Sequence, residues 1–185
     1  MNKIETELKD CFILEPKRFG DNRGYFSSVT NFDIQSLGFN DINQISNSMS
    51  NKGIVRGLHF QKEPYCQAKV VRCHQGAVLD VVVDVRKGSP TYGKSIAVEL
   101  TPENGRMLYV PRGFAHGFLV LSDKAEFVYK CTDVYDPTSE GGVPWNDPDI
   151  NIEWPKLDVP YKTSEKDEKH EAFKTQDFSW AEKWR

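Results

Sequence analysis

The clearest pattern in the chain is a series of short apolar runs between about residues 10 and 155, separated by turn-forming stretches. In the run AVLDVVVDVR, residues 77–86, side chains alternate between the two faces of a strand. One face carries Leu79, Val81, Val83 and Val85, and the other carries Asp80, Val82, Asp84 and Arg86. Further strands are predicted over residues 94–100, 106–110, 116–121 and 125–132. Short strands joined by Gly- and Pro-containing turns are typical of an all-β sandwich or barrel.

Two stretches depart from the strand pattern. NFDIQSLGF, residues 31–39, predicts one short helix that ends near Gly38. Beyond Trp154 and Pro155 the sequence becomes highly charged, which favours a short helical stretch near the C-terminus. No repeat, low-complexity linker or second apolar core is evident, so residues 1–185 are expected to form a single domain.

Composition excludes several classes of protein. Of the 185 residues, 38% are hydrophobic and 28% are charged, which argues against disorder. A net charge of −3 is atypical of a general nucleic-acid or membrane binder. No apolar run approaches the roughly 18 residues of a membrane span, and MNKIETELKD lacks the apolar segment of a secretion signal. Four cysteines without CxxC spacing are expected to be reduced thiols in a cytoplasmic protein.

Two polar residues interrupt the apolar stretch GIVRGLHFQ, residues 53–61. Arg56 and His59 lie within what otherwise reads as a buried strand. From the residues alone, the pair is compatible with satisfied polar groups in a core, with a metal site or with a reaction centre.

A second stretch, GRMLYVPRGFAH at residues 105–116, has the spacing G-x5-P-x-G-x2-H. It resembles the second motif of the cupin superfamily, except that Val120 stands where that motif has Asn. Pro111 and Gly113 predict a tight turn, after which His116 points into a small barrel. A metal-binding cupin also needs an H-x-H motif, but Phe60 and Gln61 follow His59. With four histidines in the whole chain, a metal site is not expected.

Six segments together carry a more specific resemblance. They are GIVRGLHFQ, VVVDVRKGSPTYGK, VPRGFAHGFLVLSD, FVYKCTDVYDP, WNDPDINIEWP and SEKD. In this order, over about residues 20–167, the chain resembles the dTDP-4-dehydrorhamnose 3,5-epimerases. The resemblance implies a jelly-roll cupin that forms a homodimer, holds no metal or organic cofactor, and acts on nucleotide-linked 4-keto-6-deoxy sugars.

Epimerisation beside a keto group requires a base, an acid on the opposite face of the ring, and stabilisation of the enolate oxygen. The resemblance assigns His59 as the base and Asp167 of SEKD as its orienting partner. Part of the tail from about residue 156 must then fold back over the barrel. Tyr129 matches the proton donor. Lys69 matches a residue near the keto oxygen, where a positive charge favours the enolate. His116 matches a substrate-binding residue of the pocket, as a donor to the same oxygen or to the sugar.

The resemblance also implies a nucleotide-binding set. The matching positions are Arg23, Arg56 and Lys166 for the diphosphate, Tyr135 for stacking on the base, and Glu140 and Gln44. Two positions depart from the family pattern: Ser28 stands where the family has an acidic residue, and Ser46 stands where it has Asn. The smaller Ser28 leaves room for a purine nucleotide or a heptose-type sugar, such as a GDP-4-keto-heptose.

Four functions remain open at this point. The chain is expected to be an epimerase acting at C3 and C5 of a sugar nucleotide in surface-carbohydrate biosynthesis. The alternatives are an epimerase acting on one carbon, a sugar-nucleotide-binding cupin without turnover, and a metal-dependent cupin enzyme. The partners expected are the sugar nucleotide and a second copy of the chain, with no nucleic acid and no membrane.

Arg56 and His59 make one geometric prediction possible. Residues three apart in a regular strand point to opposite faces. If both serve one pocket, the strand must shift phase between them, and Gly57 is the expected position of a bulge.

Overall fold

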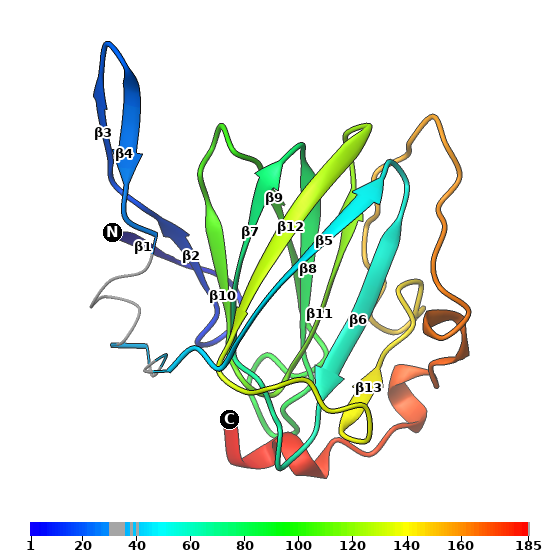
Figure 1. Ribbon diagram of the computed structural model, residues 1–185. Helices are drawn as coiled ribbons and strands as arrows, with labels where there is room; N and C mark the ends of the chain where they lie inside the picture. Colours follow the sequence, from blue (N-terminus) through cyan, green and yellow to red (C-terminus); the bar gives the residue numbers. More distant parts are fainter. Residues whose placement is uncertain (30–35, 38, 40, 185) are drawn as a thin grey trace.

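The computed structural model describes residues 1–29, 36–37, 39 and 41–184, and strands account for most of their regular structure (Figure 1). The strands are β1 (Asn2–Glu5), β2 (Phe12–Glu15), β3 (Arg18–Asp21), β4 (Gly24–Ser27), β5 (Gln44–Asn51), β6 (Val55–Gln61), β7 (Lys69–Gln75), β8 (Val78–Asp84), β9 (Ser95–Leu100), β10 (Met107–Val110), β11 (Phe114–Val120), β12 (Lys124–Cys131) and β13 (Glu140–Gly142). Three 3-10 helices follow: η1 (Asp167–Lys169), η2 (Phe173–Thr175) and η3 (Ser179–Trp184). The helix predicted over residues 31–39 falls largely outside the described residues.

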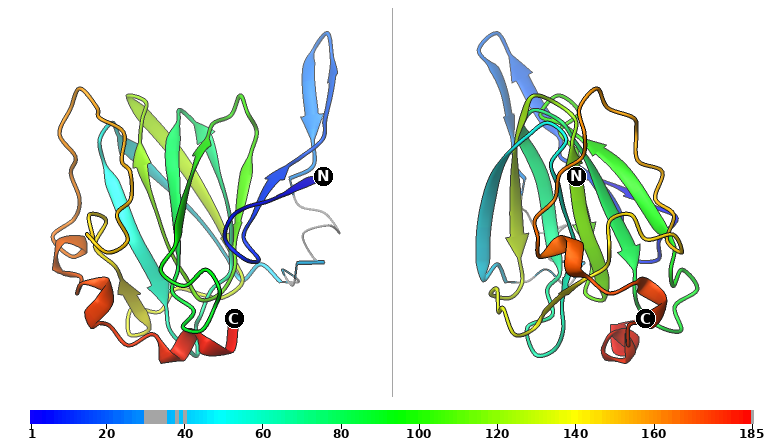
Figure 2. Two further views of the ribbon diagram at one scale, coloured as in Figure 1. Left: turned by 180° about the vertical axis from the view of Figure 1, so that it is seen from behind. Right: turned by 90° about the vertical axis from the view of Figure 1, so that its right-hand side faces the viewer.

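The strands form two facing sheets, as the prediction of an all-β jelly-roll barrel requires. One sheet has the order β1-β2-β10-β7-β12-β5, and the other has the order β13-β6-β11-β8-β9. The views in Figure 2 show the two layers edge-on and from behind. A separate hairpin, β3–β4, projects from the body on the side away from β6 (Figures 1 and 2).

The alternation along β8 distributes its side chains between two cores. Val82 lies in the core between the sheets, together with residues such as Phe118. Val81 and Val83 lie on the other face, where Phe173 and Phe178 of the C-terminal segment cover the sheet. Burial on both faces explains why this strand is more apolar than a strand with one solvated face. The predicted strands over residues 77–86, 94–100, 106–110, 116–121 and 125–132 are confirmed as β8 to β12.

A bulge interrupts β6 at Gly57, as predicted. His59 pairs with His116 of β11 and Arg56 pairs with Phe118, so two residues of β6 face the single residue Gly117. Gly57 has φ +114°, a value that glycine adopts far more readily than other residues. The following peptide bond, Gly57–Leu58, is cis. The shift brings the side chains of Arg56 and His59 to one hollow.

The C-terminal segment returns to the start of β6. Ile54 and Lys162 form a parallel bridge, in which the Val55 N–H donates to the Lys162 carbonyl at 2.8 Å. The Lys162 N–H donates to the Gly53 carbonyl at 2.9 Å. This pairing fixes the position of the chain just before η1, and η1 carries Asp167. Among the described residues, no helix is both long and apolar enough to cross a membrane.

Candidate active site

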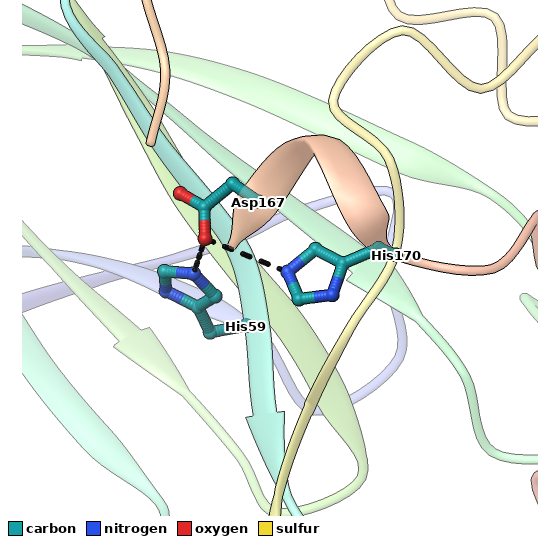
Figure 3. A group of neighbouring side chains, drawn as sticks. All are labelled: His59, Asp167 and His170. Carbon is teal, nitrogen blue, oxygen red and sulfur yellow. Dashed lines mark hydrogen bonds and ion pairs between the residues drawn. The ribbon is translucent and has the colours of Figure 1, made fainter. Parts of the chain in front are cut away.

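A histidine–carboxylate pair lies where η1 meets β6. His59 Nε2 lies 2.6 Å from Asp167 Oδ1 (Figure 3). The other oxygen of Asp167 accepts hydrogen bonds from the Gly57 N–H at 3.2 Å and from the Thr163 hydroxyl at 3.3 Å. Asp167 is buried, whereas 31% of the His59 side chain is exposed. The carboxylate is therefore anchored in the protein, and the imidazole reaches from it toward solvent.

The charge state of this pair follows from its contacts. Burial raises the pKa of Asp167, but the neighbouring rings of His170 and His59 outweigh burial and hold that pKa well below its usual range. The carboxylate is therefore ionised and accepts the Nε2 proton of His59. In the neutral ring, Nδ1 then carries the free lone pair, which is the arrangement of a general base with an orienting carboxylate.

His59 faces a hollow of about 340 Å³, a size typical of small-molecule sites. Its lining includes the predicted site residues Arg56, His59, Glu140, Lys166 and Asp167. The guanidinium of Arg56 also donates to the Ser50 hydroxyl at 2.9 Å, which holds it at the edge of β5.

Five of the residues predicted to bind the nucleotide form one chain of hydrogen bonds. The Gln44 amide donates to the Ser46 hydroxyl at 2.8 Å, and its carbonyl oxygen accepts from the Tyr135 N–H at 2.6 Å. The Tyr135 hydroxyl donates to Glu140 at 2.5 Å, and Glu140 also pairs with Lys166. Half of Tyr135 is exposed, so its ring presents a free face beside the hollow.

A second polar group lies inside the barrel. His116 Nε2 lies 2.8 Å from Asp80 Oδ1, and both side chains are buried. Burial raises the pKa of Asp80, while the charges of His116 and Lys69 oppose that rise. The second carboxylate oxygen of Asp80 is buried without a hydrogen-bond partner among the described residues. Asp80 was absent from the predicted site, although its position on an inward face of an apolar strand was a signal for it.

Tyr129 belongs to this interior group. Its ring lies edge-on to His116 with the centroids 6.2 Å apart, and its hydroxyl lies 3.4 Å from the Ser48 hydroxyl. Burial strongly raises the pKa of the phenol, whereas the nearby charge of Arg56 lowers it slightly. The phenol therefore remains protonated at neutral pH. Ser46, Ser48 and Ser50 share one face of β5, so a single row of hydroxyls contacts Gln44, Tyr129 and Arg56 in turn.

Two residues predicted to bind the substrate, Arg23 and Ser28, lie away from the His59 hollow of their own chain. Arg23 is at the tip of the β3–β4 hairpin, where it pairs with Asp21 at 2.5 Å and its side chain is 86% exposed. Ser28 follows β4 directly. The hairpin projects from the side of the molecule away from β6, so neither residue joins the His59 hollow of its own chain (Figure 1).

Comparisons with known proteins show the family to which the chain belongs. A family model described as dTDP-4-dehydrorhamnose 3,5-epimerase matches residues 5–175. The chain is 52% identical over 158 residues to the dTDP-4-dehydrorhamnose 3,5-epimerase of Shigella flexneri, covering 84% of this chain and 87% of that protein.

Solved structures are similar over most of the chain. The dTDP-6-deoxy-D-glucose-3,5-epimerase RmlC of Legionella pneumophila, in complex with dTDP-4-keto-L-rhamnose, is 41% identical with a TM-score of 0.90, covering 97% of this chain and 96% of that one. A double mutant of ChmJ, a 3′-monoepimerase from Streptomyces bikiniensis in complex with dTDP, is 32% identical with a TM-score of 0.86, covering 93% and 87%. In that mutant a histidine is replaced by asparagine and a tyrosine by phenylalanine.

The fold and the histidine–carboxylate pocket define the class as a β-barrel sugar epimerase. The chain belongs to the dTDP-4-dehydrorhamnose 3,5-epimerase family, as the resemblance of its motifs predicted.

Proposed function

We propose that this protein epimerises C3 and C5 of a dTDP-linked 4-keto-6-deoxy sugar by proton transfer through an enolate. The observation that carries the proposal is the His59–Asp167 pair at 2.6 Å, with Asp167 buried and His59 facing the hollow. Protons on carbon atoms beside a ketone are acidic enough for an imidazole base, provided that the enolate oxygen is stabilised.

In this mechanism, His59 Nδ1 removes the proton and the resulting imidazolium is stabilised by Asp167. The carbon–hydrogen electron pair moves into the enolate, whose oxygen gains negative charge. Lys69 supplies the opposing positive charge from the start of β7, and His116, whose tautomer is fixed by Asp80, supplies a second polar group. Tyr129 then delivers a proton to the other face of the carbon. A partly buried phenol with a raised pKa suits this role because it remains protonated until the carbanion forms.

The nucleotide is proposed to lie along the hydrogen-bonded chain from Gln44 to Lys166. Arg56 and Lys166 offer positive charge to the diphosphate, and Tyr135 offers an aromatic face to the base. The names of the relatives favour thymidine as the nucleoside. The four described thiols are free and buried, which suits a reducing compartment such as the cytoplasm.

A homodimer would give the remaining predicted residues a role. Arg23 and Ser28 lie on or beside a hairpin that projects from the barrel and exposes Phe19, Tyr25 and Phe26. We propose that this hairpin docks on a second copy of the chain, where Arg23 and Ser28 join the nucleotide end of the partner's pocket. Exposed aromatics on a projecting element are typical of such an interface.

An epimerase acting on a single carbon is the second candidate, because a 3′-monoepimerase is among the similar solved structures. The two enzymes need the same base and acid. They differ in how long the enolate is held and in which carbons the sugar ring presents to them.

One experiment separates the candidates. The protein is incubated in D₂O with dTDP-4-keto-6-deoxyglucose, and NMR locates the deuterium and the inverted centres. Deuterium and inversion at both C3 and C5 support the proposal, while a change at one carbon supports the second candidate. No uptake from the dTDP sugar would refute both. Titration with dTDP and GDP checks the nucleotide, and tighter binding of GDP would contradict the choice of thymidine.

A further inference from the structure

A second imidazole, that of His170, lies beside the His59–Asp167 pair and takes no proton in the proposed reaction. His170 directly follows η1, and its side chain is only 10% exposed. Its Nε2 lies 3.5 Å from Asp167 Oδ1, an ion-pair contact that Figure 3 draws as a dashed line. Among the described residues this nitrogen makes no hydrogen bond. We propose that His59, Asp167 and His170 form a binding site for one divalent transition-metal ion such as Zn²⁺, and that this ion switches off the catalytic base.

The three ligand atoms converge on one point. His59 Nε2, Asp167 Oδ1 and His170 Nε2 all lie within 4.8 Å of one another. Zinc bonds of roughly 2.0–2.1 Å in a tetrahedron place neighbouring ligand atoms about 3.3 Å apart. The 3.5 Å separation of His170 from Asp167 already fits this spacing. His59 Nε2 and Asp167 Oδ1, now 2.6 Å apart, must separate to about this spacing when the ion takes the place of the proton between them.

Both histidine rings are oriented for a common ligand. Their planes cross at 79°, with the centroids 5.7 Å apart, so the rings do not stack and their nitrogen-bearing edges face Asp167 (Figure 3). Two imidazoles and one carboxylate are a donor set for late transition metals and leave further positions for water. Hard ions such as Mg²⁺ prefer sites made of oxygen ligands alone.

The fold holds His170 in this position by two features. Asp167 and His170 are three residues apart in a 3-10 turn, where residues i and i+3 lie on the same face. Gly142 of β13 leaves space for the ring, because a Cβ atom there would lie 2.3–2.6 Å from three atoms of the imidazole. The turn and the absence of a side chain at Gly142 together allow the buried Nε2 to lie beside the carboxylate.

Metal binding would inactivate His59 through its tautomer, and this part of the inference rests on the proposed function. A neutral imidazole carries one proton. When the ion takes the lone pair of Nε2, that proton must sit on Nδ1, and the nitrogen that faces the substrate has no lone pair left. The bound ion therefore blocks the base without filling the sugar pocket.

Binding is tested first with the metal alone. Untagged, full-length protein is treated with EDTA, desalted and dialysed against ZnCl₂, and the bound zinc is measured by atomic emission. We expect one saturable equivalent per chain, and no comparable binding of Mg²⁺. His170→Phe keeps the ring volume against Gly142 and removes the ligand nitrogen. It should weaken binding by more than about tenfold, since losing even an outer-sphere partner costs that much.

The matched control is His74→Ala, which removes an exposed histidine of β7 outside the cluster and should leave zinc binding unchanged. His170→Ala is the second variant if thermal melting shows that His170→Phe is poorly folded. Equal zinc affinity in wild type and in both His170 variants would overturn the site, as would no saturable binding by wild type.

The second readout is deuterium exchange into the dTDP sugar with and without ZnCl₂. Wild type should lose exchange on adding zinc and regain it with EDTA. His170→Phe should keep measurable exchange, at a rate below that of wild type because Asp167 loses a neighbouring ring that holds its pKa low, and this exchange should resist zinc. Saturable zinc binding without loss of exchange would refute the inhibitory role. A wild type that binds zinc but never exchanges any proton would refute the proposed function and leave the metal site standing.

Discussion

Gly57 sets the position of His59, and replacing it by alanine tests that dependence. At φ +114°, an added Cβ atom would lie 2.7 Å from the His116 carbonyl oxygen and 2.8 Å from the Gly117 Cα. Both contacts are with the backbone of β11, so rotation of a side chain cannot relieve them. Either β6 moves away from β11, or the bulge changes shape and turns His59 away from Asp167.

The expected cost combines two terms. Placing a side chain at a positive φ costs roughly 1–2 kcal/mol, and forcing an extra carbon into a packed site costs about 1–3 kcal/mol. A loss of about 3 kcal/mol from the free energy of unfolding is therefore expected for Gly57→Ala. For a chain of this size, that corresponds to a fall in Tm of about 6–12 °C.

Urea and thermal unfolding of Gly57→Ala and Gly93→Ala provide the assay. Gly93 also has a positive φ, +75°, but its nearest atoms are Phe173 Cε1 and Cζ at 3.5 and 3.6 Å, an ordinary contact. Gly93→Ala therefore carries the backbone strain without the collision and should lose only about 1–2 kcal/mol. If the two variants lose the same free energy of unfolding within about 0.5 kcal/mol, the contacts of the added Cβ atom with β11 do not destabilise the protein, and the reasoning is refuted.

Three further variants probe separate parts of the account. Asp167→Asn should keep the fold and lower the rate of deuterium exchange by about 10²–10⁴-fold, because the amide cannot stabilise the imidazolium; a loss below tenfold would contradict this. Tyr129→Phe should still exchange deuterium, since His59 can return the proton to the same face, but should form inverted product at least about 100-fold more slowly; unchanged inversion would remove Tyr129 from the acid role. Asp84→Asn should lower the free energy of unfolding by about 3 kcal/mol, because it removes the buried carboxylate at 2.9 Å from the Arg86 guanidinium and leaves only the half-exposed carboxylate of Asp10. Burial raises the pKa of Asp84, but hydrogen bonds from Arg86, Thr91 and Ser89 bring it below its usual value. The stability gained from the carboxylate is therefore complete above about pH 5 and lost as the pH falls through and below about 4. A difference between wild type and Asp84→Asn that does not shrink between pH 5 and pH 3 would contradict the pairing.

Much of the fold could be predicted from local patterns because the strands are short and well marked by turns. The alternation in residues 77–86 identified β8 and separated Val82 from Val81 and Val83 correctly. The bulge at Gly57 could also be predicted, because Arg56 and His59 are three apart and no regular strand brings both to one pocket.

Other features depend on contacts between distant segments, which a local pattern does not contain. His170 lies in a charged stretch that reads as a solvated tail, and only the return of residues 160–167 along β6 brings it to His59. The proposed metal site takes its ligands from β6 and the segment around η1, so no H-x-H spacing in the sequence marks it. Arg23 matched a pocket position by its motif, but its position in the fold places it on a projecting hairpin.

The central claim is that His59, held by Asp167, is the base that removes a carbon-bound proton from a 4-keto sugar nucleotide. The most direct test is the rate of deuterium uptake into dTDP-4-keto-6-deoxyglucose by wild type, His59→Ala and the control His74→Ala, followed by NMR in D₂O. Wild type and His74→Ala should exchange at similar rates, and uptake by His59→Ala should fall at least about 100-fold, to the limit of detection. Exchange by a folded His59→Ala variant at the wild-type rate would contradict the account.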